Sequence, residues 1–201
     1  MKTKATTLTT EIKDKLYQWE TYSEEELGAL ITKFERIPRE AVSSANVSLL
    51  TDDVLADKLV EIGRAYSKNS NLLCNIISAL GNMVKRYGLR PRKHIFDFFV
   101  AAAKNRKANF YVSLFLYSFP QYKQWNGKWG YLVSMASIAP KKKSITNFHT
   151  EIKRIVKDHN DDIPSDTRIQ IVRILDTYRK SGVLSEDLQK DYLNTLCLLV
   201  A

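Results

Sequence analysis

The sequence is poor in cysteine, glycine and proline, and each shortage excludes a class of protein. Its 201 residues include 2 Cys, 7 Gly and 5 Pro. Two cysteines cannot build the disulfide framework of a small secreted domain, and Cys74 and Cys197 lie in apolar helical patterns without metal-ligand spacing. The scarcity of glycine and proline argues against long disordered linkers and turn-rich β folds. We therefore expect a globular protein from a reducing compartment.

Long hydrophobic runs are also missing. Residues 1–15 contain no apolar signal core, and the longest apolar run, residues 109–119, is too short to span a bilayer. We expect a cytoplasmic protein, nuclear as an alternative in a eukaryote, without integral membrane association. The hydrophobic content of 44% and charged content of 26% are ordinary for a soluble chain with a real core.

Motifs for catalysis, cofactors or metals are absent from the sequence. It contains no HExxH, no GxSxG, no Gly-rich phosphate loop and no spaced set of Cys and His. His94 and Asp97 lie one helical turn apart and could touch, but such pairs are common by chance. His149 and Glu151 point in different directions on one helix and cannot bind a metal together. We predict a protein that is not an enzyme and binds no cofactor or metal.

Helical periodicity is present along most of the chain, and clean strand alternation is not. Ser23 and Glu26 have the spacing of a capping box, and Gly88 is placed to end a helix in the left-handed conformation. The run over residues 107–119 is apolar all round and is predicted to be the most enclosed helix. Further helix starts are predicted near residues 51, 71, 91, 108, 128, 144, 165 and 185.

These starts are about twenty residues apart, or about forty per helical pair. That period is typical of HEAT or armadillo repeats, in which antiparallel helix pairs form a right-handed stack. An irregular helical bundle fits the same spacing, because no residue-level similarity links the units. We predict one all-α domain over residues 1–201, with N-terminal helices in residues 1–50 and a regular helix-pair array in residues 51–201 whose middle, residues 81–160, is basic.

Positive charge is concentrated in the middle of the chain. Residues 81–160 hold 16 Lys and Arg against 3 Asp and Glu, a net charge of +13, whereas residues 1–80 and 161–201 each carry −2. Several of these cations stand at predicted helix starts, where the helix dipole disfavours them by about 0.3–1 kcal/mol. They are Arg92, Lys93, Lys107 and the run Lys141–Lys143. Because local stability does not explain them, we predict a negatively charged partner.

An antiparallel helix array should gather these cations on two edges, because loops alternate between its ends. Helices two places apart lie about 16–20 Å from each other. One predicted edge holds six cations: Lys104, Arg106, Lys107, Lys141, Lys142 and Lys143. The opposite edge holds Lys85, Arg86, Arg90, Arg92, Lys93, Lys123 and Lys128.

The aromatic residues of this region divide into two groups. Those on helical stripes are predicted core residues: Phe96, Phe99, Phe110, Phe115 and Phe119. Tyr122, Trp125 and Trp129 lie instead in a polar, Gly-containing loop, where they could anchor a protein partner or stack on bases. The alternative for the two tryptophans is that they fold back over the hydrophobic stack.

We predict a binding module that recognises an acidic protein through a basic, aromatic-bearing surface, as inhibitors, immunity proteins or adaptors do. Its predicted contact residues are Arg90, Arg92, Lys93, Lys104, Arg106, Lys107, Tyr122, Lys123, Trp125, Lys128, Trp129, Lys141, Lys142 and Lys143. The alternative is a nucleic-acid-binding protein that uses the same cations for phosphate contacts. The split of the cations between two edges favours a protein partner over a continuous nucleic-acid groove. Anionic lipid is a weaker alternative, because the run at 141–143 is shorter than a usual polybasic cluster.

The last segment, residues 194–201, stays apolar to the end of the sequence. The end of a helical stack normally carries a polar cap. Either this helix packs inward, or it docks on another chain such as a second copy, or the sequence is part of a longer one.

Overall fold

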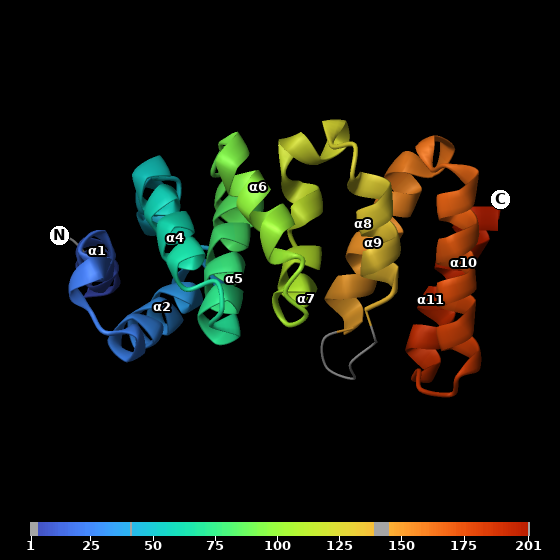
Figure 1. The fold of residues 1–201 in the computed structure, drawn as a ribbon, viewed down its shortest axis with the longest axis horizontal. Helices are drawn as coiled ribbons and strands as arrows, with labels where there is room; N and C mark the ends of the chain where they lie inside the picture. Colours follow the sequence, from blue (N-terminus) through green and yellow to red (C-terminus); the bar gives the residue numbers. More distant parts are fainter. Residues whose placement is uncertain (1–3, 41, 139–144, 201) are drawn as a thin grey trace. The chain divides into compact units, whose positions relative to one another are not determined.

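The computed structural model describes residues 4–40, 42–138 and 145–200, with side chains for 10–40, 42–138 and 151–200. All regular elements in these ranges are helices, which confirms the all-α prediction (Figure 1). The chain divides into two compact units, Met1–Gln121 and Tyr122–Ala201. That the two units behave as one domain stays a prediction.

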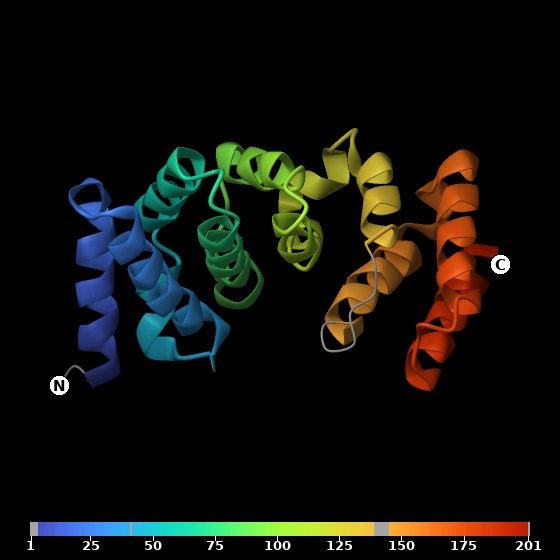
Figure 2. The same cartoon turned by 60° about the horizontal axis from the view of Figure 1, so that its bottom comes forward.

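The first unit is built from helix pairs in two layers (Figure 2). Its helices are α1 (Lys4–Tyr17), α2 (Glu24–Arg39), α3 (Val47–Leu50), α4 (Asp53–Ala65), α5 (Ser70–Tyr87), α6 (Lys93–Ala102) and α7 (Ala108–Ser113). The 3-10 helices η1 (Trp19–Thr21), η2 (Ser44–Asn46) and η3 (Leu116–Ser118) lie between or after them. In one layer α4 packs between α1 and α6, and in the other α5 packs between α2 and α7.

The second unit follows a similar pattern with fewer helices. After η4 (Pro120–Gln124) it contains α8 (Lys128–Ala136), α9 (Ile145–His159), η5 (Asn160–Asp162), α10 (Ser165–Lys180) and α11 (Glu186–Val200). Helix α8 packs on α10, α9 packs on α11, and α10 and α11 pack on each other. The helix pairs agree with the predicted pairing, while the HEAT or armadillo type of the repeat stays a prediction.

Helix α11 packs inward with one face and is exposed on another. Leu188, Tyr192 and Leu199 are buried, whereas Leu193 and Val200 keep 50% and 74% of their surface exposed. One of the predicted options, inward packing, therefore holds for part of this helix, and docking of its exposed side on a second copy stays a prediction. No helix in the described part of the chain has the combined length and apolar composition of a membrane span.

Local capping places several helix ends where the sequence predicts them. Ser23 and Glu26 form the capping box, in which the Ser23 N–H donates to the Glu26 carboxylate at 2.9 Å and the Ser23 side chain accepts from the Glu26 N–H. Gly88 ends α5 with a φ of 78°, which a glycine adopts without steric cost. Other starts shift by two residues: α5 is capped by Asn69, and α6 begins at Lys93.

The prediction that residues 107–119 form the most enclosed helix is wrong. Helix α7 stops at Ser113, whose hydroxyl donates to the carbonyl of Phe110 at 2.6 Å, and a 3-10 helix follows. Aromatic and β-branched residues are mediocre helix formers, and a serine that bonds the local backbone competes with the helix. The apolar character of this stretch therefore signals burial but not helix length.

Helix α5 is the enclosed helix of the first unit. All nine residues from Ile76 to Val84 are buried, so the helix is covered on every side. Helices α2, α3, α4 and α7 pack around it. The phenylalanines predicted to be core surround the same region: Phe96, Phe99, Phe115 and Phe119 are buried, and Phe110 is half-buried.

Glycines on two helices make room for phenylalanine rings. A Cβ atom on Gly81 of α5 would lie 2.2 Å from a ring carbon of Phe115, and one on Gly63 of α4 would lie 2.4 Å from the ring of Phe98 on α6. Such distances are far inside van der Waals contact. The two glycines therefore allow the neighbouring elements of each layer to approach closely.

Polar groups buried between α2 and α5 have partners. The Ser78 hydroxyl and Arg39 Nε each donate to Glu35 Oε1 at 2.7 Å. At the end of α2, Arg86 Nη1 donates to the carbonyls of Pro38, at 3.1 Å, and Arg39. Arg86, which the sequence assigns to a basic edge, thus satisfies backbone groups at a helix C-terminus.

Asp52 connects α1 to α4. Its Oδ1 accepts hydrogen bonds from the N–H groups of Val54 and Leu55, at 2.8 and 3.1 Å, so Asp52 rather than the predicted residue 51 caps α4. Its Oδ2 lies 2.5 Å from Lys13 Nζ. Burial raises the pKa of Asp52, but the bonds from Lys13 and the two N–H groups outweigh it, and the pKa lies below its ordinary value of 3.8.

We expect Gly81→Ala to lower the free energy of unfolding by about 1–3 kcal/mol, because the added methyl group overlaps the Phe115 ring. Gly28→Ala on α2 is the matched control, since a Cβ there has nothing within 4 Å. The control is expected to raise stability by about 0.5–1 kcal/mol through helix propensity. Urea unfolding followed by circular dichroism measures both, and equal effects of the two substitutions would contradict the close packing at Gly81.

We expect Asp52→Asn to remove part of the acid sensitivity of the protein. A carboxyl group with a lowered folded-state pKa stabilises the fold fully above its ordinary pKa, and this contribution is lost as the pH falls through the folded value. Wild type should therefore lose more stability below about pH 4 than Asp52→Asn does. Thermal melts between about pH 3 and 7 measure this, with Asp53→Asn in the same turn as the control. Identical pH profiles for wild type and Asp52→Asn would refute the role of Asp52.

Candidate functional site

The predicted contact residues are distributed over both units. The first unit contains Arg90, Arg92, Lys93, Lys104, Arg106 and Lys107, and the second contains Tyr122, Lys123, Trp125, Lys128 and Trp129. Lys141, Lys142 and Lys143 lie outside the described residues. The predicted edges that combine residues of both units therefore stay predictions.

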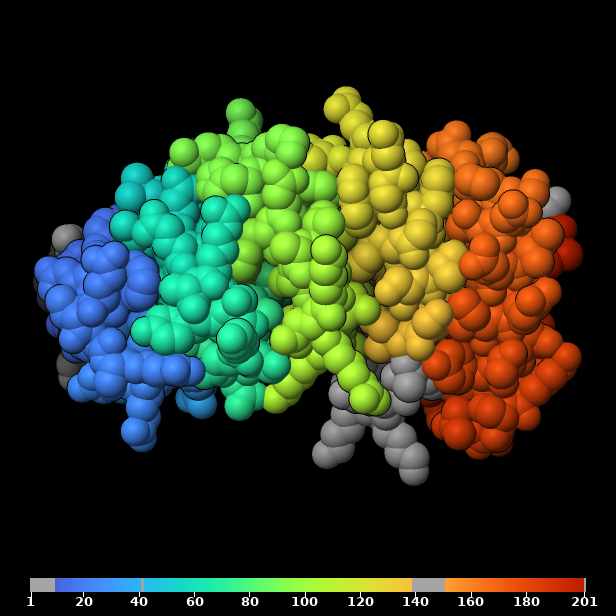
Figure 3. Space-filling model, in the orientation of Figure 1, coloured from blue at the N-terminus to red at the C-terminus, as the bar shows by residue number. Residues whose placement is uncertain are grey.

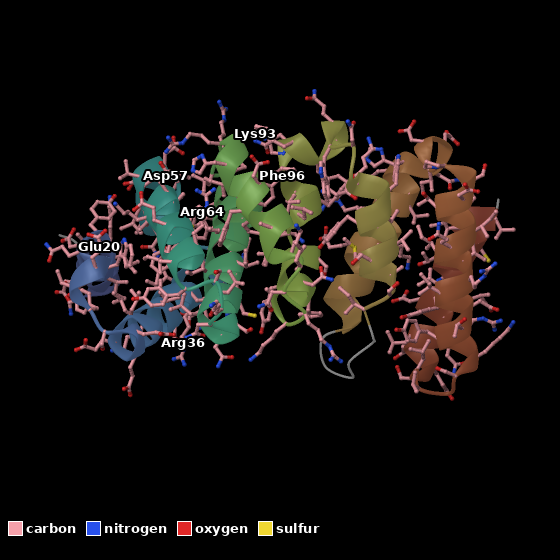
Figure 4. The ribbon with its side chains drawn as sticks, in the orientation of Figure 1. Glu20, Arg36, Asp57, Arg64, Lys93 and Phe96 are labelled. Carbon is pink, nitrogen blue, oxygen red and sulfur yellow. The ribbon has the colours of Figure 1, made fainter. Side chains whose placement is uncertain are left out.

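The cations at the start of α6 are held by acids of the first unit. The Arg92 guanidinium donates to the Asp57 carboxylate of α4, and Lys93 Nζ lies 2.7 Å from Asp97 Oδ2. Asp57 and Lys93 are labelled in Figure 4. His94 Nε2 lies 2.8 Å from Asp57 Oδ1, so its partner is on α4 and not the nearby Asp97. The inference that these helix-start cations lack a structural explanation is wrong for Arg92 and Lys93, because α4 and the next turn of α6 supply counter-charges.

Two further cations of the first unit contact neighbouring helices. Lys107 Nζ donates to Asn71 Oδ1 at the start of α5. Lys85 Nζ donates to the carbonyl of Leu114 at 3.2 Å and lies 6.0 Å from the centre of the Phe115 ring. These contacts join α5 to α7 and the turn after it, which gives both lysines a structural role.

Four further cations of the first unit lie where the end of α4 and the loop after it meet the loop after α6, whereas Lys15, Lys33 and Arg36 are exposed on α1 and α2. Asn105 Nδ2 donates to Ser70 Oγ at 3.1 Å, which brings the two loops together. We name four exposed cations the loop-end cluster: Arg64 in the last turn of α4, Lys68 in the loop after it, and Lys104 and Arg106 in the loop after α6. Within the ranges that the structure describes, their side chains make no ion pair or hydrogen bond. Arg90 is also exposed without such a contact, but it lies in the turn that precedes α6.

Sequence reasoning finds Lys104 and Arg106 but misses Arg64 and Lys68. These two belong to residues 1–80, where acids balance cations, and Arg64 stands in the last turn of α4, where the helix dipole already favours a cation. A residue count along the chain cannot show that two loops thirty-five residues or more apart meet in space. The hydrogen bond from Asn105 to Ser70 shows that the two loops meet, and only the structure reveals this bond.

A cleft opens beside the loop-end cluster, between α4, α5 and α6. Its volume is about 460 Å³, within the range of about 300–1,000 Å³ that ligand sites usually occupy. Leu73 and Phe98 contribute apolar surface, and Lys104 and Arg64, the latter labelled in Figure 4, contribute charge. Helices α4 and α6 lie next to each other on the face seen in Figure 3. The cleft thus combines an apolar interior with a basic edge.

The aromatic loop of the second unit is folded inward. Tyr122 has 1% of its surface exposed, so the prediction that it contacts a partner is not supported by its position in the core. The Trp125 ring lies 6.1 Å from the Tyr122 ring and 5.7 Å from the Tyr131 ring, between centroids. A Cβ on Gly127 would lie 2.7 Å from Trp125, so this glycine makes room for the indole. Of the two predicted alternatives, folding back describes Trp125.

Trp129 is also engaged within the second unit. Its ring centre lies 6.4 Å from that of His159 in an edge-on arrangement, and Lys128 Nζ lies 5.0 Å from the Trp129 ring centre. Lys128 also donates to the carbonyl of Lys123 at 2.6 Å. Half-buried and in contact with a cation, Trp129 is a weaker candidate for a partner contact than an exposed indole would be.

Groups of three or more His, Cys, Asp or Glu suited to a metal are not found among the residues that the structure describes. Burial raises the pKa of Tyr131 and of Tyr192, as expected of core tyrosines whose neutral form is favoured. The side chain of His149 lies outside the described residues.

Comparison of the chain with models of known protein families, with curated proteins and with solved structures finds no match.

We expect Trp125→Ala to lower the unfolding free energy by about 1–3 kcal/mol, less than the 3–5 kcal/mol typical of a fully buried tryptophan, because the indole is half-buried. Gln124→Ala, an exposed neighbour, is the control and should change stability little. Chemical denaturation of purified variants measures both. A stability unchanged by Trp125→Ala would mean that the indole does not cover the core and would return it to the set of partner contacts.

Proposed function

We propose that this chain is a non-enzymatic helical binding module that recognises an acidic protein through the loop-end cluster and the cleft beside it. Inhibitors, immunity proteins and adaptors are the kinds of protein that act in this way. The observation that carries the proposal is the separation of the cations into two sets. Arg92, Lys93 and Lys107 are neutralised or bonded within the unit, whereas the four residues of the loop-end cluster are not.

Four exposed cations at the end of α4 and in the two adjoining loops raise the local positive potential. The helix dipole of α4 favours Arg64, whereas Lys68, Lys104 and Arg106 are exposed cations without partners, which add little to stability. A charged patch of this kind speeds the encounter with an acidic protein and selects against basic ones. The cluster is thus explained by binding better than by folding.

The aromatic residues support a protein partner over a nucleic acid. Non-specific binding of single strands depends on exposed aromatic rings on which bases stack. Tyr122 is buried, Trp125 is half-buried against Tyr122 and Tyr131, and Trp129 is half-buried beside Lys128, so none of the three is a fully exposed ring. We further propose that the protein acts in the cytoplasm, in keeping with the scarcity of cysteine in its sequence.

The proposal is tested by comparing wild type with Lys104→Glu/Arg106→Glu in a salt-titrated anisotropy assay. The probes are fluorescent polyglutamate and fluorescent single-stranded and duplex DNA and RNA. Lys33→Glu/Arg173→Glu is the matched control, since both residues are exposed, lie outside the cluster and change the net charge equally. We expect the cluster variant to bind polyglutamate at least about tenfold more weakly and the control to stay within about twofold.

Other results would decide against the proposal. DNA or RNA that binds more tightly than polyglutamate, with a steep salt dependence and loss in the cluster variant, would assign the surface to nucleic acid. Equal weakening by the cluster variant and its control would show that only net charge matters. Absence of binding to polyglutamate by wild type would remove the acidic-partner proposal.

A further inference from the structure

We propose that the acidic partner inserts one apolar side chain into the cleft between α4 and α6, while its flanking carboxylates pair with Arg64 and Lys104. This inference rests on the proposed function, and it specifies the partner's chemistry: an extended acidic segment with a single aliphatic or aromatic residue. The loop-end cluster alone would accept any polyanion, whereas the cleft adds selection for an apolar group.

The most deeply buried residues that line the cleft are apolar. Leu73 and Phe98 line it with 3% and 4% of their surface exposed, and Ala102 with 6%. Because so little of each residue is exposed, the cleft offers no broad apolar face on which a helix could lie. A volume of about 460 Å³ with this lining suits one inserted side chain together with the adjoining backbone.

The position of the Phe98 ring depends on Gly63. Gly63 has no side chain, so the Phe98 ring can lie directly against α4. A Cβ atom on residue 63 would lie only 2.4 Å from Phe98 Cζ. Any larger residue at 63 would have to displace the ring. The cleft is therefore shaped by a specific contact between α4 and α6 and is present without a ligand.

The charges around the cleft fit an acidic segment. Arg64 on α4 and Lys104 after α6 both line it, and Lys68 and Arg106 extend the positive charge along the adjoining loops. Asp97 also lines the cleft, but Lys93 holds its carboxylate through two hydrogen bonds, at 2.7 and 3.0 Å. An apolar anchor surrounded by charge pairs is a common arrangement of binding energy at protein interfaces.

The inference is tested with two fluorescent peptides of glutamate and serine. One carries a single central leucine, and the other carries serine at that place. Ala101→Tyr narrows the cleft, because Ala101 is exposed on α6 and lines it. Ala29→Tyr is the matched control, an exposed alanine on α2 that does not line the cleft. Ser67→Tyr, which narrows the cleft from the α4 side, is a second variant should Ala101→Tyr fail to fold.

We expect wild type to bind the leucine peptide about tenfold or more tightly than the serine peptide, as burial of one leucine side chain implies. Ala101→Tyr or Ser67→Tyr should abolish this ratio, and Ala29→Tyr should keep it. Lys104→Glu should weaken binding of both peptides.

Two patterns would overturn the inference, and they differ in what they leave standing. Equal affinity of wild type for both peptides, with loss of both in Lys104→Glu, would reject the cleft but retain the acidic-partner proposal. A preference for leucine that persists in Ala101→Tyr and Ser67→Tyr would place the apolar contact elsewhere. If neither peptide binds to wild type, the inference and the proposed function both fail.

Discussion

The burial of α5 is the constraint on which the first unit depends. A helix covered on every side must be surrounded by other elements, and α2, α4 and α7 take these places. Close approach then requires a small residue at Gly81, against the Phe115 ring. It also requires partners for the polar groups of the buried helix: Ser78 donates to Glu35, and Asn82 donates to the carbonyl of Ser78 at 2.8 Å. An unsatisfied group there would cost about 1–3 kcal/mol.

The same packing decides which charges are free. Where helices meet at their ends, the side chain of a cation on one helix can bond to a carbonyl or carboxylate group of another. Arg86 satisfies carbonyls at the end of α2, and Arg92 joins the start of α6 to Asp57 on α4. The cations that remain available to a partner are therefore fewer than the net charge of residues 81–160 indicates. The free cations of the first unit include the loop-end cluster, which lies beside a cleft.

The proposed binding site consists of a cleft and a charge cluster that lie at one place in the first unit. The His94–Asp57 pair has the distance of a catalytic dyad, but Arg92 holds the same carboxylate, which fits a structural role better than that of a general base. The second unit is consistent with this view. In the second unit the indole of Trp125 packs against Tyr131 and Gly127 of the same unit, so its observed contacts are structural.

The sequence by itself determined the helical class, the capping box at Ser23 and the stop at Gly88, because these depend on periodicity and on residues within one turn of each other. It also located the phenylalanines of the core. It could not decide which cations are free, since the partners of Arg92 and Lys107 lie more than thirty positions away along the chain. Nor could it show that Arg64 and Lys104 border one cleft. Only the tertiary structure brings residues of different helices together, and the candidate site consists of such residues.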